Sequence, residues 1–130
     1  MVRLSALILS LAAAAWPALA QSTNQRFGSA TRFTASTGEG IYADLCQGCH
    51  MPGGVGATGA GTYPALAQNP KLASAAYVMT MVLGGRKAMP AFGDFLDDGQ
   101  VAAVANFVRG HFGNAYPDDA TAADARAVRR

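Results

Sequence analysis

The chain has 130 residues and a formal net charge of +2 at neutral pH, with 10 lysine and arginine residues against 8 aspartate and glutamate residues. This near balance excludes the strongly basic face that nucleic-acid binding requires. A chain of this length forms a single small domain, and it has only two cysteines, Cys46 and Cys49.

The first 20 residues have the order of a secretory signal peptide. Arg3 gives a short basic start, residues 4–16 form an uncharged apolar run, and Ala18 and Ala20 place small residues where a signal peptidase reads. A retained membrane anchor is the alternative, but a spanning helix takes about 20 apolar residues and this run is shorter. We therefore predict cleavage after Ala20, a periplasmic location and no membrane span in the mature chain.

The next segments are a polar leader, a helix and a loop. Residues 21–36 show little periodicity and are predicted to be a leader. A first helix is expected over 37–46, because Ser36 and Glu39 form a capping-box pattern and apolar residues follow at helical spacing. The stretch 51–62 is rich in glycine and is predicted to be a loop.

Two further helices have clear start and stop signals. The second begins at Asn69-Pro70, a cap followed by a proline at the first helical position, and ends at Gly84-Gly85. The third spans residues 98 to about 109 behind a capping box formed by Asp97 and Gln100. Apolar residues lie on one stripe of each helix, so both are expected to pack on a common core.

An irregular segment and a tail complete the chain. Residues 86–96 hold the pair Met89-Pro90, and residues 114–130 follow the third helix. Thr121 is placed to cap a short helix within this tail, although we favour a solvated tail. The chain is thus predicted to be all-α, with one domain over 37–113.

Cys46-Gln47-Gly48-Cys49-His50 has the spacing that attaches haem c. Each thiol adds across one vinyl group, two intervening residues let both cysteines reach the same macrocycle, and His50 then lies beneath the iron. A zinc site needs about four ligands, which two cysteines and two histidines supply poorly. A thioredoxin-like pair needs a βαβ setting, and a plain disulfide leaves His50 without a function. We predict one covalent haem c, attached through Cys46 and Cys49, with His50 as an iron ligand.

A second axial ligand would keep the iron six-coordinate in both oxidation states. The candidates are Met51, Met79, Met81, Met89 and His111. The methionine adjoining His50 cannot reach the opposite haem face, the two mid-helix methionines are expected to fill the core, and the histidine after the last helix is expected at the surface. Met89 lies in the irregular segment, where the following proline stiffens the backbone. We predict Met89 as this ligand, a histidine–methionine pair that raises the reduction potential.

The sequence resembles class I cytochromes c over about residues 37–111. The residues that match the pattern of that family, besides the motif, are Gly38, Tyr42, Pro64-Ala65-Leu66, Met89-Pro90, Val104 and Phe107. The resemblance implies the cytochrome c fold, in which three main helices surround one haem. It also implies that the first and last helices cross at the matching glycine and aromatic positions.

The resemblance implies further residue roles. The Pro64 carbonyl would accept a hydrogen bond from the free ring nitrogen of His50, with Pro52 as the alternative; such bonds fix the ring and raise its basicity. Many members place a tryptophan near a haem propionate, but the only tryptophan here is Trp16, in the predicted signal peptide. The residues left open as its substitutes are Tyr63, Tyr77 and Arg86.

A narrower resemblance, carried by residues 88–93, 106–109, 111–114 and 121–124, is to small cytochrome subunits of exported dehydrogenases. It implies a non-catalytic carrier that takes single electrons from a periplasmic dehydrogenase and passes them to an oxidase or another cytochrome of the respiratory chain. The alternatives are a dedicated haem subunit of one dehydrogenase complex and an open-site haem protein that binds a small ligand. Hydrophobic residues expected near the haem edge, as a small docking patch, are Met51, Val55, Ala88 and Phe92.

Overall fold

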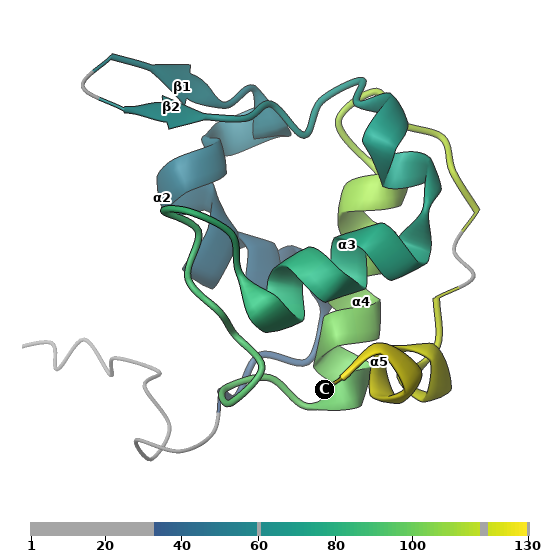
Figure 1. Cartoon of the computed structure of the whole chain (residues 1–130). Helices are drawn as coiled ribbons and strands as arrows, with labels where there is room; N and C mark the ends of the chain where they lie inside the picture. Colours follow the sequence, from purple (N-terminus) through teal and green to yellow (C-terminus); the bar gives the residue numbers. More distant parts are fainter. Residues whose placement is uncertain (1–32, 60, 118–119, 130) are drawn as a thin grey trace, which may run out of the picture.

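The structure is a computed structural model that describes residues 33–59, 61–117 and 120–129. Helices predominate, as predicted, and one short hairpin is added to them (Figure 1). In chain order the elements are α1 (Gly38–Ile41), η1 (Tyr42–Cys46), α2 (Gln47–His50), η2 (Pro52–Gly54), β1 (Ala57–Thr58), β2 (Thr62–Tyr63), η3 (Pro70–Ala73), α3 (Ala75–Gly84), α4 (Asp98–Gly110) and α5 (Ala122–Val128). The predicted signal peptide over 1–20 and residues 21–32 of the predicted leader lie outside the described residues.

The helix that leads into the cysteine motif begins one residue later than predicted. The Thr37 side chain accepts a hydrogen bond from Gly40 N at 3.1 Å, so Thr37 caps α1 and the predicted cap at Ser36 is wrong. The helix also extends beyond Cys46, because α1 continues through the π-helical turn η1 into α2 and ends at His50. The whole motif therefore lies on helical backbone.

Helices α1 and α4 make a close contact at a glycine. A Cβ atom built on Gly38 would lie 2.2 Å from the Ala103 carbonyl oxygen and 2.6 Å from Phe107 Cβ, so a side chain would not fit. Beside this contact, the ring centroids of Tyr42 and Phe107 are 5.6 Å apart, and Val104 is buried. These positions meet in the structure, as the resemblance implied.

The segment predicted as the second helix forms two pieces. Asn69 caps η3 by accepting a hydrogen bond from Lys71 N at 3.1 Å, and Pro70 takes the first position, as predicted. Ser74 then adopts an extended conformation and caps α3, because its hydroxyl accepts from a backbone N–H of the next turn at 3.2 Å. Serine favours such a cap over the helix interior. Gly85, with φ 63°, ends α3 as predicted.

Helix α4 begins as the sequence predicted. Gln100 N donates to Asp97 Oδ1 at 2.8 Å, and Asp97 N donates to Gln100 Oε1 at 2.9 Å, which completes the capping box. The Gln100 amide also donates to the carbonyl oxygens of Phe33 and Ala35, at 2.9 and 2.8 Å. The end of the leader is therefore attached to the start of α4.

The hairpin of β1 and β2 was not predicted. Its strands are antiparallel, with Ala57 opposite Tyr63, and each has only two residues. Strands this short carry no alternating pattern that a sequence could reveal. Gly56 precedes the hairpin with φ 69°, and a Cβ there would lie 2.4 Å from the Tyr63 carbonyl oxygen. The glycine-rich stretch thus folds back onto the residues that lead to Pro64.

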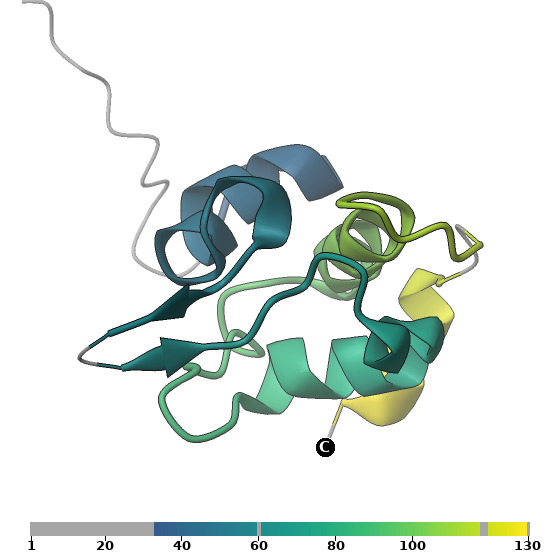
Figure 2. The ribbon, with the colours of Figure 1, turned by 90° about the horizontal axis from the view of Figure 1, so that it is seen from above.

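Helices α3, α4 and α5 pack against one another around a buried apolar core. Seen from above, α1, η1 and α2 lie on one side of the molecule, while α3 and the loop that follows it lie on the other (Figure 2). Thr121 caps α5, and Ala125 is fully buried, so the described part of residues 114–130 is not a solvated tail. In the part of the chain that the structure describes, no helix has the length and apolar character needed to cross a membrane.

Candidate haem-attachment site

A π-helical turn sets the rotation of the cysteine motif. The N–H of Gln47 donates to the Tyr42 carbonyl five residues earlier, so η1 contains one residue more than an α-helical turn. One residue corresponds to about 100° of rotation in an α-helix. The insertion therefore changes the direction of Cys46, Cys49 and His50 relative to the α1 residues that pack on α4. Such turns are frequent at functional sites.

His50 is buried, with 9% of its surface exposed, and its ring is held from outside the motif. Its Nδ1 lies 2.9 Å from the Pro64 carbonyl oxygen. A carbonyl only accepts hydrogen bonds, so Nδ1 carries the proton and Nε2 presents its lone pair for a metal. The contact is with Pro64; Pro52, the alternative, begins η2 instead.

The segment that carries Pro64 is itself fixed by backbone hydrogen bonds. Leu66 N and Ala67 N both donate to the Gly54 carbonyl, at 2.7 and 2.9 Å, and Gly56 N donates to the His50 carbonyl at 2.9 Å. These bonds connect the residue before the hairpin to the end of α2 and the residues after it to η2, which directly follows α2. The position of the Pro64 carbonyl therefore follows from the same backbone that carries the histidine.

A buried asparagine after α4 completes this support, and the sequence analysis did not identify it. The Asn114 side chain donates to the Leu66 carbonyl at 2.8 Å and to the Val108 carbonyl at 2.9 Å, and it accepts from Asn69 N at 2.9 Å. It thus connects the end of α4 to the Pro64 segment. No local pattern marks such a residue, because its partners lie far away in the sequence.

Cys46 and Cys49 are both free thiols and half-buried. Burial, with a smaller contribution from Cys49, raises the pKa of the Cys46 thiol from 9.0 to about 11. A redox-active dithiol requires a lowered pKa, so this environment disfavours the thioredoxin-like alternative. Two unpaired thiols followed by a histidine with an available Nε2 are the donor set that haem c requires, and the residues fit that group.

Three of the other candidates for the second axial position have structural contacts of their own. The fourth, Met81, is half-buried on α3 and does not belong to the buried core, so the expectation that it fills the core is wrong. Met79 is 1% exposed, in the core. Met51 directly follows His50 with φ 65°, and its carbonyl accepts from the Tyr42 hydroxyl at 2.7 Å. His111 is exposed, stacks on Phe107 with ring centroids 4.2 Å apart, and its Nδ1 lies 2.8 Å from the Phe107 carbonyl.

Met89 is half-buried in the loop between α3 and α4 and packs against the core. Arg86 N donates to the Met89 carbonyl and Met89 N donates to the Arg86 carbonyl, both at 3.0 Å. Gly85 precedes this pair with φ 63°, and a Cβ there would lie 2.5 Å from the Met89 carbonyl oxygen. The methionine therefore lies in a tight, internally hydrogen-bonded turn.

The match to a protein family covers most of the described chain. Residues 33–108, which include the cysteine motif, Pro64 and Met89, match the family described as cytochrome C oxidase, cbb3-type, subunit III. Among solved structures, cytochrome c6 from the diatom Phaeodactylum tricornutum is similar, with a TM-score of 0.47 and 29% identity over 70% of this chain and 93% of that one. The cytochrome XoxG from Methylobacterium extorquens AM1 gives a TM-score of 0.47 and 27% identity over 65% and 54% of the two chains.

Two curated relatives are subunits of dehydrogenases. The gluconate 2-dehydrogenase cytochrome c subunit of Pantoea cypripedii is 35% identical over 108 residues, which are 74% of this chain and 24% of that protein. The fructose dehydrogenase cytochrome subunit of Gluconobacter japonicus is 31% identical over 109 residues, which are 72% of this chain and 22% of that protein. The chain thus spans about a quarter of the length of these relatives.

Proposed function

The chain belongs to the family of c-type cytochromes described as cytochrome C oxidase, cbb3-type, subunit III, and from this membership we propose that it is a non-catalytic haem c subunit that takes single electrons from an exported dehydrogenase. The observation that carries the proposal is the 2.9 Å contact between His50 Nδ1 and the Pro64 carbonyl, which leaves Nε2 for iron. Bound haem supplies the one-electron couple of its iron. The chain supplies the attachment and the ligands.

Each proposed haem or iron ligand has a distinct function. Cys46 and Cys49 would hold the macrocycle through thioethers, and His50 and Met89 would supply the nitrogen and the sulfur that bind the iron. Pro64 keeps the imidazole in one tautomer and one orientation. Both proposed ligands lie on hydrogen-bonded backbone, so the chain would hold the same two donor atoms in place whichever oxidation state the bound iron had.

The partner follows from the relatives. Both are named as cytochrome subunits of dehydrogenases, so we favour a dedicated haem subunit of a dehydrogenase over a carrier that diffuses alone. The electron leaves to an oxidase or to another cytochrome. Of the predicted docking residues, Val55 is 63% exposed and Ala88 is also exposed, which suits a small apolar contact surface. The signal-peptide pattern over residues 1–20 supports the proposal that these events take place in the periplasm.

An optical experiment tests the iron ligands. Oxidised wild-type protein should show the weak sulfur-to-iron charge-transfer band, and reduced protein should resist carbon monoxide. Met89→Ala should lose the band and bind carbon monoxide, whereas Met81→Ala, which removes a methionine from α3, should retain the band. Ready carbon monoxide binding by the wild type would instead support the open-site alternative.

A second experiment tests the partner. The native protein is purified from the periplasm under mild conditions and its companions are identified. A dehydrogenase that co-purifies in fixed stoichiometry supports a dedicated subunit. A protein recovered alone, yet reduced by a periplasmic extract supplied with dehydrogenase substrates, indicates a diffusing carrier. Retention of the protein in the cytoplasm would contradict the proposed export.

A further inference from the structure

The loop that carries Met89 is held on one side by the end of α3. Phe92 N donates to the Val82 carbonyl at 2.9 Å, and Gly93 N donates to the Leu83 carbonyl at 3.1 Å. A Cβ on Gly93 would lie 3.0 Å from the same Leu83 oxygen, a tight approach. The N–H groups of Phe92 and Gly93 are therefore attached to α3. The Phe92 carbonyl accepts from Phe95 N and Leu96 N within the same loop, at 3.0 and 2.9 Å, whereas the Gly93 and Leu96 carbonyls need partners from elsewhere in the chain.

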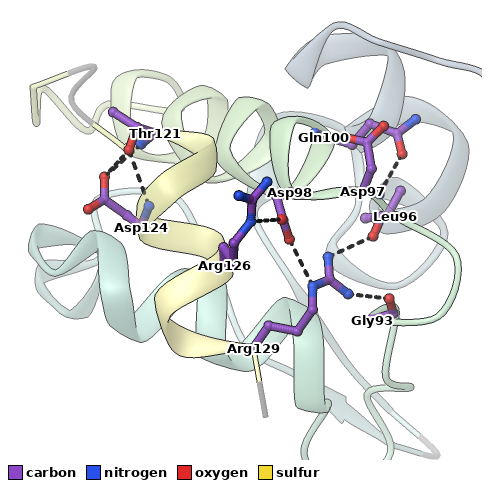
Figure 3. A network of polar contacts seen from close by, with 9 residues as sticks. All are labelled: Gly93, Leu96, Asp97, Asp98, Gln100, Thr121, Asp124, Arg126 and Arg129. Carbon is purple, nitrogen blue, oxygen red and sulfur yellow. Dashed lines mark hydrogen bonds and ion pairs between the residues drawn. The ribbon is translucent and has the colours of Figure 1, made fainter.

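Those partners come from the residue that follows α5. The guanidinium group of Arg129 donates through one terminal nitrogen to the Gly93 carbonyl and through the other to the Leu96 carbonyl, the latter at 2.9 Å. Its Nε donates to Asp98 Oδ1 at 2.8 Å. One planar group thus bridges two loop carbonyls and the first turn of α4 (Figure 3), a geometry that arginine provides and lysine does not.

Helix α5 is firmly docked, so Arg129 has a fixed base. Asn106 on α4 donates to the Ala120 carbonyl and accepts from Ala120 N, both at 2.9 Å. Thr121 and Asp124 then form a capping box, and Ala125 is fully buried. The helix is attached to α4 before it begins and again, through Asp98, where it ends.

We propose that α5 with Arg129 is a latch that positions the Met89 loop, so that Arg129 acts on the iron ligand through the carbonyls of Gly93 and Leu96. This inference rests on the proposed ligation by Met89. Arg129 is a positioning residue, since in this structure it contacts the loop downstream of the methionine. Without the latch, the second half of the loop keeps its bonds to α3 and the long bond from Phe33 N to the Phe95 carbonyl, at 3.4 Å, but loses the two hydrogen bonds that Arg129 donates.

The chain offers a matched control in Arg126. Arg126 Nε also donates to Asp98, to Oδ2 at 3.1 Å, but neither loop carbonyl accepts a hydrogen bond from it, and its side chain is 79% exposed against 31% for Arg129. If α5 only adds stability through its charge contacts with Asp98, Arg126→Ala and Arg129→Ala should behave alike. If the latch positions the loop, only Arg129→Ala should affect the iron.

The experiment compares the wild type, Arg129→Ala and Arg126→Ala as full-length proteins with haem attached. Arg129→Ala removes two charge-assisted hydrogen bonds to the loop. Since the loss of one such bond already changes a population about tenfold, we expect the carbon-monoxide-reactive fraction of the reduced variant to rise by about that factor or more. In denaturant, its charge-transfer band should disappear before helix content falls. Arg126→Ala should match the wild type in both measurements. Equal behaviour of the two variants would overturn the latch.

Two further measurements separate the latch from the ligation. Amide hydrogen exchange at Phe92 and Gly93 should accelerate in Arg129→Ala but not in Arg126→Ala, whatever ligand the iron has. Unchanged exchange overturns the latch, whereas a wild type without the charge-transfer band overturns only the ligation by Met89. If Arg129→Ala fails to fold, Arg129→Lys retains the charge beside Asp98 without the bridge, and it should show the same changes in smaller amounts.

Discussion

Replacing Gly38 by alanine tests the contact that orients the cysteine-bearing helix. The added Cβ would lie 2.2 Å from the Ala103 carbonyl oxygen and 2.6 Å from Phe107 Cβ, where ordinary contact begins at 3.4 Å. The nearer atom belongs to the backbone of α4, which cannot rotate aside as a side chain can. The two helices must therefore separate by about 1 Å, the order of the overlap, in a close-packed interior.

The expected loss of unfolding free energy in Gly38→Ala follows from two opposing effects. Overpacking of this kind destabilises by about 1–3 kcal/mol, occasionally more, and the backbone clash at Gly38 indicates the upper end. Alanine is intrinsically better in a helix by about 1 kcal/mol, so a net loss of about 2 kcal/mol remains. For a domain of this size that lowers Tm by roughly 8–16 °C.

The assay is thermal unfolding of the haem-containing protein followed by circular dichroism. Gly84→Ala is the matched control, because Gly84 also lies in a helix and a Cβ there meets nothing within 4 Å. The control should leave Tm unchanged or slightly raised. If Gly38→Ala unfolds at the temperature of Gly84→Ala, the close helix contact is not what requires glycine at position 38.

Three further changes test the supports of the two proposed iron ligands. Asn114→Ala leaves two carbonyls and one N–H without their partner and should cost about 2–4 kcal/mol of unfolding free energy in denaturant titrations; a loss under 1 kcal/mol would contradict this. Gly85→Ala, at φ 63°, should distort the Met89 turn and weaken the charge-transfer band, and an unchanged band would refute that. Hydrogen bonds from Arg129 and then Arg126 hold the pKa of the Asp98 carboxyl below its ordinary 3.8. Its contribution to stability is thus present above that pH and lost as the pH falls through the lower folded value. NMR should show the Arg129 Nε–H signal shift in that acidic range, and a signal unaffected by acid would contradict the pairing.

Features set by neighbouring residues could be predicted from the sequence. The capping box of α4, the proline start of η3 and the glycine end of α3 formed as expected. The cap of α1 was missed because Ser36 and Thr37 have equivalent hydroxyls. Which of them caps the helix depends on where Gly38 meets α4, a distant contact. Ser74 similarly divides a segment whose apolar pattern runs on without interruption.

The residues of the site also divide into those that the sequence predicts and those that only distant contacts reveal. The haem motif is local and was evident, and the Pro64 contact followed from the family resemblance. The bond from Asn114 to Leu66 spans 48 residues, and that from Arg129 to Gly93 spans 36. Both asparagine and arginine are common at surfaces, and only the tertiary structure shows that these two side chains hold backbone carbonyls.

These distant contacts hold the Pro64 segment and the Met89 loop in a similar way. The Pro64 segment is held by the backbone near His50 and, through Asn114, by the end of α4. The Met89 loop is held by the end of α3 and, through Arg129, by the start of α4. Helix α4 is therefore connected by hydrogen bonds to the segments that support both proposed iron ligands, one at each of its ends. A shift of α4 along its axis would move the supports of both proposed ligands together, so the contact of α4 with Gly38 on α1 would help to fix the proposed coordination as well as the fold.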